Sequence, residues 1–151
     1  MRSPSQIPVI LLAEDDPGDV LMITEALQRT GSPRDVRVVG DGQEALDFLR
    51  RAGDHGRAPR PDLILLDLNM PRLDGRQALE VIKADSDLKV IPIVVFTTSA
   101  SAIDINGSYD RHANAYVSKP LELDALDAVV QQIDRFYFSV CAFVPPGRRT
   151  A

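Results

Sequence analysis

The feature that most constrains this chain is a series of short apolar runs separated by segments with helical periodicity. Three of the runs lack alternating polar residues, as expected for parallel strands that are covered on both faces. Five runs recur: VILLA at 9–13, VRVV at 36–39, LILL at 63–66, IVVF at 93–96 and AYV at 115–117. Strands alternating with helices predict one doubly wound α/β domain with right-handed crossovers.

Each interval between the runs, and the segment after the last one, predicts a helix. The first begins at Pro17 with Asp16 as its cap, and we expect it to end near 30–31. The helix over 102–111 is the weakest prediction, because Asn106-Gly107 inside it costs about 1 kcal/mol in helix propensity. We expect that element to be mobile. The apolar positions of the other helices are Val20, Ile23 and Leu27; Ala45, Phe48 and Leu49; Ala78, Leu79 and Ile82; and Leu126, Val129, Val130, Ile133 and Tyr137.

Charge and cysteine content exclude several classes of protein. A net charge of −5 argues against general affinity for nucleic acid or anionic membranes. The lone Cys141 cannot form an intrachain disulfide, and the run at 9–13 is too short for a signal peptide or a membrane span. We therefore expect a cytoplasmic protein that binds neither nucleic acid nor membranes.

Carboxylates follow two of the predicted strands directly: Glu14 and Asp15 after the first, and Asp67 after the third. Ligands bind at this carboxyl edge in open α/β sheets, where neighbouring strands lie about 4.8 Å apart. Two such charges 4 Å apart repel by roughly 4 kcal/mol at an effective dielectric of about 20. Oxygen ligands of this kind suit Mg²⁺, which commonly bridges carboxylates to phosphate. The alternative is that these residues are helix caps and surface acids.

Two further strand ends add complementary chemistry. Thr97 closes IVVF with a hydroxyl group, and Lys119 follows AYVS with a cation. A carboxylate nucleophile, a metal, a hydroxyl and an ammonium are the groups needed to move a phosphoryl group onto an aspartate. Individually, Thr97 would fit a helix cap and Lys119 a solvated charge, so the inference rests on their joint placement.

Four motifs now resemble one family. LLAEDD, LILLDLNMPRLDG, VVFTTSA and AYVSKP, in that order, are similar to the receiver domain of bacterial two-component response regulators over residues 7–135. The resemblance implies a flavodoxin-like sheet of five parallel strands in the order 2-1-3-4-5, with five helices. Residues 1–6 would be an N-terminal tail and 136–151 an aromatic C-terminal extension.

The resemblance also implies roles for the matching residues. Asp67 would accept phosphate from the phosphohistidine of a sensor histidine kinase, Thr97 would hydrogen-bond a phosphoryl oxygen, and Lys119 would pair with another. The ring of Tyr116 would turn inward when Thr97 moves. The Lys119–Pro120 peptide bond would be cis, as is usual in the family. We thus expect a phosphoacceptor rather than an enzyme, with the possibility of self-phosphorylation from small donors and of autodephosphorylation.

A magnesium site follows from the same resemblance. Asp15 would bind Mg²⁺ directly, Glu14 through water, and Asn69 through its backbone carbonyl, beside Asp67. Asp16 matches a position just outside this pocket and fits better as a helix cap.

Within this family, the small single-domain regulators of bacterial phytochromes are the most similar, through DDPGDVLMITEAL, DGQEALDFLR, ANAYVSKP and an aromatic tail. A phytochrome-type kinase is therefore the expected partner. His112 departs from the pattern, since such sequences usually carry glycine there. If the backbone needs a positive φ at that position, histidine costs roughly 1 kcal/mol.

The C-terminal segment suggests self-association. About 15 residues follow the last predicted helix, too few for a DNA-binding module, so output would come from partner binding or dimerisation. One helix face can bury only some of the aromatic residues there, and the surplus would form a homodimer contact. Completion of the core is the alternative, and the sequence does not decide between helix and strand. The residues are Phe136, Tyr137, Phe138 and Phe143.

Three other functions remain as alternatives. A stand-alone Mg²⁺-dependent phosphohydrolase could use the same aspartyl-phosphate chemistry, but position 69 is Asn where a second acid would be expected. A flavin or nucleotide binder would need a phosphate-binding loop after the first strand, where EDDPGD would repel phosphate without a metal. A degenerate receiver would act only as a binding surface, but all pocket positions are present.

Overall fold

The computed structural model describes residues 7–144 and confirms the expected fold class. Within that range all the strands are parallel and lie in the order β2-β1-β3-β4-β5. The strands are β1 (Val9–Ala13), β2 (Asp35–Val39), β3 (Leu63–Leu66), β4 (Ile93–Thr97) and β5 (Ala115–Ser118). The helices are α1 (Pro17–Gln28), α2 (Gly42–Arg50), α3 (Gly75–Ala84), α4 (Ala102–Asp110) and α5 (Leu123–Arg135). The predicted tail at 1–6 and the end of the extension, 145–151, lie outside the described residues.

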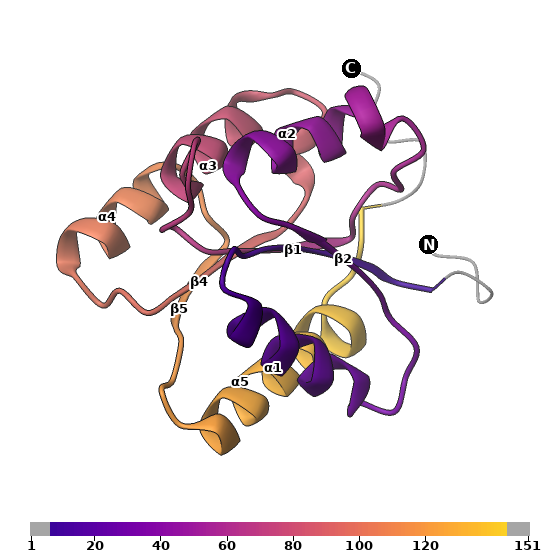
Figure 1. Ribbon diagram of the computed structural model, residues 1–151, viewed down its shortest axis with the longest axis vertical. Helices are drawn as coiled ribbons and strands as arrows, with labels where there is room; N and C mark the ends of the chain where they lie inside the picture. The colour runs from indigo at the N-terminus through magenta and orange to yellow at the C-terminus, as the bar shows by residue number, and fades with distance from the viewer. Residues whose placement is uncertain (1–6, 145–151) are drawn as a thin grey trace.

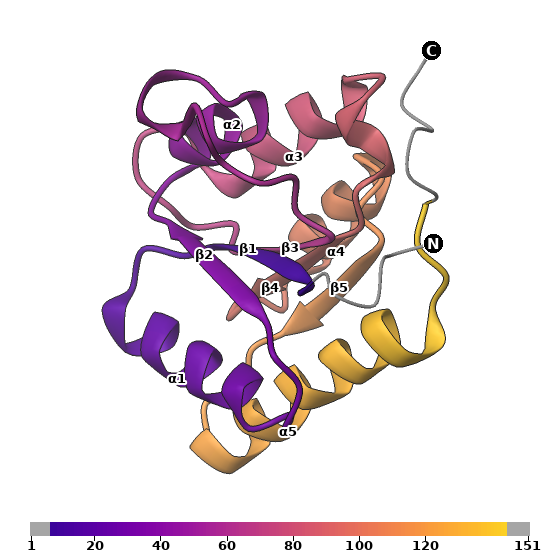
Figure 2. The ribbon, with the colours of Figure 1, turned by 90° about the vertical axis from the view of Figure 1, so that its right-hand side faces the viewer.

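The sheet is covered on both faces, with α1 and α5 on one side and α2, α3 and α4 on the other (Figures 1 and 2). Successive residues of a strand therefore enter different cores: Ile10 and Leu12 face α1 and α5, whereas Leu11 and Ala13 face the other layer. Both layers exclude water, which explains why these strands show no polar alternation.

Short polar side chains start four of the helices. The Asp16 carboxylate accepts from the backbone N–H of Gly18, as predicted. Asp41 caps α2, and Asp74 caps α3 in a capping box with Gln77. The predicted helix over Asn106-Gly107 forms as α4, where the Ser101 hydroxyl accepts from the Asp104 N–H at 3.1 Å. The mobility of α4 stays a prediction.

The backbone at two positions tests two of the sequence predictions. His112 has a φ of 71°, so the left-handed conformation is present although the residue is not glycine. The Lys119–Pro120 peptide bond is trans, so the expectation of a cis bond was wrong for this structure.

Helix α5 continues into a π-helical turn, η3 (Phe136–Val140), and the chain then runs on without regular structure through residue 144. The described part of the extension is therefore helical first and never a strand. None of the helices in the described range is both long and apolar enough to cross a membrane.

Candidate functional site

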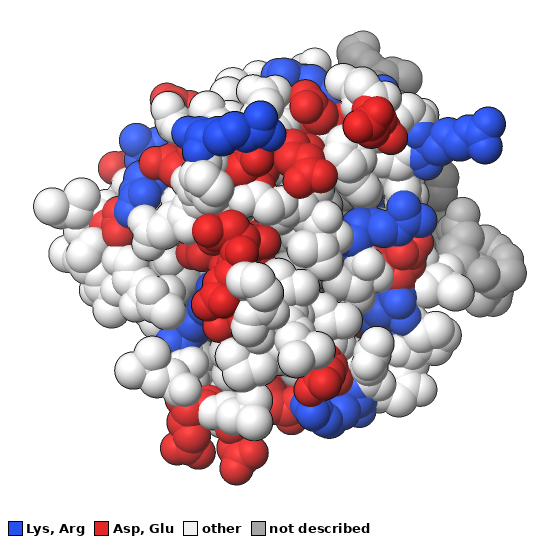
Figure 3. Space-filling model, viewed as in Figure 1, with Lys and Arg blue, Asp and Glu red and all other residues white. Residues whose placement is uncertain are grey.

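Three carboxylates meet at the carboxyl edge of the sheet. Strands β1 and β3 are neighbours, and the pairing of Ala13 with Leu66 places Glu14 and Asp15 beside Asp67. One oxygen from each of the three lies within 4.8 Å of the others. Acidic side chains gather near the middle of the face in Figure 3, where β1 ends in Figure 1. The predicted convergence of these residues is confirmed.

Lys119 enters this cluster from the end of β5. Its Nζ donates to Glu14 Oε1 and to Asp19 Oδ2 at 3.0 Å, and lies 3.5 Å from Asp67 Oδ2. The backbone N–H of Lys119 donates to the Thr97 carbonyl at 2.7 Å, which fixes its position against β4. The ammonium thus lies beside the Asp67 carboxylate, at the strand end where the sequence placed it.

Burial controls the protonation of this pair. Glu14 and Lys119 are 2% and 7% exposed. Burial raises the pKa of the Glu14 carboxyl to about 7, although the hydrogen bond and charge of Lys119 oppose the rise. Burial alone would lower the pKa of Lys119, but its hydrogen bond to Glu14 and the charge of Asp67 raise it above the ordinary value. Lys119 therefore remains a cation in the pocket.

The hydroxyl of Thr97 is buried without a hydrogen bond to any of the described residues. The residue is fully buried at the end of β4, and its Oγ1 has no hydrogen-bond partner within the described residues. Leaving such a group unsatisfied costs about 1–3 kcal/mol. Because β4 lies next to β3, Thr97 and Asp67 follow or end neighbouring strands at the same edge of the sheet.

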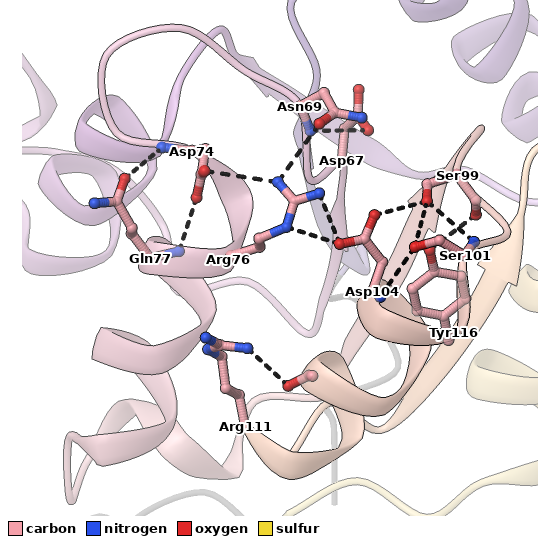
Figure 4. A network of polar contacts seen from close by, with 11 residues as sticks. Asp67, Asn69, Asp74, Arg76, Gln77, Ser99, Ser101, Asp104, Arg111 and Tyr116 are labelled. Carbon is pink, nitrogen blue, oxygen red and sulfur yellow. Dashed lines mark hydrogen bonds and ion pairs between the residues drawn. The ribbon is translucent and has the colours of Figure 1, made fainter.

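Tyr116 is tied to the loop that follows Thr97. Its hydroxyl donates to the Ser99 carbonyl at 2.8 Å, and its backbone N–H donates to the Tyr109 hydroxyl at 3.0 Å. Figure 4 shows the Tyr116 ring beside this loop, with its hydroxyl on Ser99. Any movement of the loop must therefore change the surroundings of Tyr116.

The donor atoms fit a divalent cation of the oxygen-preferring type. Glu14, Asp15 and Asp67 offer only oxygen ligands, and a divalent charge would offset their mutual repulsion. Asn69 lies in the adjoining loop, where its backbone N–H donates to Asp67 Oδ1 at 3.4 Å. This bond holds the start of the loop close to the Asp67 carboxylate.

Three charged residues near the pocket were not predicted from the sequence. Asp19, in the first turn of α1, shares Lys119 with the cluster. Arg76 and Asp104 form an ion pair across α3 and α4 at the rim of the pocket. An acidic residue in a first helical turn and an arginine between the two residues of a capping box are visible in the sequence, but their partners are distant in the chain.

Comparisons with known proteins give one family. The model of the response regulator receiver domain matches residues 10–131. The response regulator Rcp1 of Synechocystis sp. is 43% identical over 129 residues, which cover 85% of this chain and 88% of Rcp1. The phosphorylated cyanobacterial phytochrome response regulator RcpA superposes with a TM-score of 0.90 at 44% identity, covering 93% of this chain and all of that one. The Mn²⁺-bound form of Rcp1 gives 0.87 at 40%, covering 91% and 99%.

Proposed function

This chain belongs to the response regulator receiver family, and from its pocket we propose that Asp67 accepts a phosphoryl group from a sensor histidine kinase. The observation that supports this most strongly is the meeting of Asp67 with an acidic pair, a buried ammonium and an unpartnered hydroxyl at one sheet edge. A metal and a cation together suit the charge that develops on a transferring phosphoryl group.

The transfer itself is a displacement at phosphorus. An Asp67 carboxylate oxygen attacks the phosphorus of the donor phosphohistidine, and the new P–O bond forms as the P–N bond breaks. The electron pair leaves on the imidazole nitrogen. Lys119, already 3.5 Å from Asp67, then pairs with a phosphoryl oxygen.

We assign Mg²⁺ to Glu14, Asp15, Asp67 and the Asn69 carbonyl. When bound there it would neutralise phosphoryl charge and offset the repulsion among the carboxylates. The oxygen-only donor set supports this choice, and Mn²⁺ in the similar Rcp1 structure is consistent with a divalent ion.

The switch follows from the new charge. A phosphoryl oxygen gives the Thr97 hydroxyl the acceptor it lacks, and the end of β4 and α4 move with Thr97 while Tyr116 follows. Shifting such an equilibrium from 1:99 to 99:1 takes about 5.5 kcal/mol, within reach of a few charge-assisted hydrogen bonds and a metal.

The partner kinase is proposed to be of the phytochrome type. The similarity to Rcp1 and to the phytochrome response regulator RcpA supports this pairing. A stand-alone phosphohydrolase is not favoured, because the whole match lies within the receiver family.

We further propose a homodimer through the aromatic extension, on a narrower surface than the sequence suggested. Tyr137 and Phe138 pack against the core, whereas Phe136 remains 52% exposed and Val140, one helical turn later, 69%. These two residues, rather than all four aromatic rings, are the centre of the proposed contact.

The acceptor assignment is tested by Asp67→Asn. The amide is a poor nucleophile, so labelling by a phosphorylated kinase or by acetyl phosphate should fall to background. Phosphate-affinity electrophoresis and intact mass spectrometry measure it. Asp54→Asn, an exposed carboxylate in η1 (Gly53–His55), is the matched control and should label normally. Full labelling of Asp67→Asn would refute the assignment.

A further inference from the structure

Arg76 links the acceptor loop to α4. Its Nε and Nη2 donate to Asp104 Oδ1 at 2.9 and 2.8 Å, and its Nη1 lies 3.5 Å from Asn69 Oδ1 (Figure 4). Asp104 is in the first turn of α4, and Asn69 is two residues past the acceptor. One guanidinium therefore spans two segments that the switch must move relative to each other.

The network continues to the switch residues. Asp104 Oδ2 accepts from the Ser99 hydroxyl at 2.7 Å, and the Ser99 carbonyl accepts from the Tyr116 hydroxyl. Ser99 lies two residues after Thr97. If Thr97 moves toward a phosphoryl group, Ser99 moves with it, and the hydrogen bond from Ser99 to Asp104 must stretch or Asp104 must leave Arg76.

The other end of the network is fixed. Arg76 follows Gly75, whose N–H donates to the Leu68 carbonyl at 2.9 Å. A Cβ at Gly75 would lie only 2.0 Å from the Asp67 carbonyl oxygen, so the backbone there is pressed against the acceptor residue. The base of the Arg76 side chain is thus anchored to the end of β3, while its guanidinium holds α4.

We propose that Arg76 is a positioning residue that restrains phosphorylation, because its ion pair with Asp104 holds the loop at 98–101 and α4 in their unphosphorylated arrangement. This inference rests on the proposed function. The pair is well placed to act, since the side chains of Arg76 and Asp104 are 32% and 15% exposed and thus partly shielded from solvent. Breaking it removes part of what phosphorylation must overcome.

The test compares Arg76→Gln and Asp104→Asn with the unchanged protein. At limiting acetyl phosphate and fixed Mg²⁺, both variants should show a ratio of phosphorylated to unphosphorylated protein about two- to fivefold higher, as expected for one partly exposed ion pair. Without any phosphodonor, hydrogen exchange in peptides covering 98–110 should be faster by a similar factor. Arg76→Lys keeps the positive charge but loses the paired guanidinium donors, so both readouts should fall between those of the unchanged protein and of Arg76→Gln.

Arg72→Gln is the matched control. Arg72 lies in the loop that leads into α3 and is ion-paired at 2.8 Å, but with Asp41 at the start of α2 instead of with a residue of α4. It should leave both the ratio and the exchange of 98–110 unchanged.

The inference fails if Arg76→Gln leaves either readout unchanged, lowers the phosphorylated fraction, or acts no differently from Arg72→Gln. Failure of the proposed function looks different: the unchanged protein would not be labelled on Asp67, while the exchange measurement would still report on the ion pair.

Discussion

The chemistry of this pocket depends on the burial of a few polar side chains. Glu14 and Lys119 are nearly inaccessible, so each depends on the opposite charge of the other, and Asp67 adds a second negative charge beside Lys119. The Thr97 hydroxyl has no hydrogen-bond partner within the described residues. The pocket is therefore stable enough to form but lacks one acceptor, which is what a transferred phosphoryl group provides.

The Asp104 carboxyl offers a pH test at one residue. Its hydrogen bond from Ser99, then that from Arg76, hold its pKa below the ordinary value of 3.8. Since folding lowers this pKa, the carboxylate stabilises the fold above pH 3.8, and that contribution is lost as pH falls through the folded value. Ser99→Ala and Arg76→Gln should each raise the pKa of Asp104, as measured by ¹³C NMR titration of the carboxyl carbon.

The control for that titration is Arg72→Gln, which removes an ion pair of Asp41 and should leave the pKa of Asp104 unchanged. An Asp104 pKa that neither Ser99→Ala nor Arg76→Gln moves would show that the network does not hold the charge. The two variants should also lose less stability than the unchanged protein when the pH is lowered from 5 to 3, in thermal unfolding.

Two helices contain a glycine, and the space around these two glycines differs. Gly75 begins α3 where a Cβ would strike the Asp67 backbone, and this contact cannot be relieved by a side-chain movement. Gly107 lies inside α4, where a Cβ would meet only the end of the Arg111 side chain at 2.8 Å. Close packing therefore requires glycine in α3, whereas α4 only tolerates it.

Alanine substitution should separate these two cases. Gly107→Ala should stabilise the fold by about 0.5–1 kcal/mol, because alanine is the better helix former and Arg111 can move aside. Gly75→Ala should destabilise it by several kcal/mol, since the overlap is with backbone. Urea unfolding followed by circular dichroism measures both; a neutral Gly75→Ala would contradict the tight approach of α3 to β3.

At the scale of the whole molecule, contacts between residues far apart in the chain hold the C-terminal extension in place. Arg34, just before β2, forms a two-pronged ion pair with Asp134 of α5 at 2.7 and 2.9 Å, and its guanidinium lies 4.8 Å from the centre of the Phe138 ring. This arrangement fixes the start of the extension on the α1 and α5 side of the sheet. Phe136 and Val140 then remain on the surface.

Assembly is tested by the double variant Phe136→Ser/Val140→Ser. If the proposed contact forms, the unchanged protein should sediment as a dimer at micromolar concentration and this variant as a monomer, because the apolar area that drives association is lost. Leu121→Ser, at a residue 96% exposed elsewhere on the molecule, should remain dimeric. A monomeric unchanged protein would end the dimer proposal.

Residue order alone was sufficient to predict the strands, the Asp16 cap of α1 and the edge at which the pocket forms. Apolar runs and short polar caps act over a few residues, and parallel strands end at one edge, so the local pattern places Glu14, Asp15 and Asp67 at that edge. That β1 and β3 are neighbours was expected only from the family resemblance. The structure then confirmed their convergence with Lys119.

Only the folded chain decided which long side chains meet. The partnership of Arg76 with Asp104 joins residues 28 apart, and that of Asp19 with Lys119 joins residues 100 apart. The helical course of the extension was likewise decided in the folded chain, where Tyr137 and Phe138 pack against the core. A side chain with several rotatable bonds reaches many partners, and the choice depends on the crossing of helices, which no local pattern encodes.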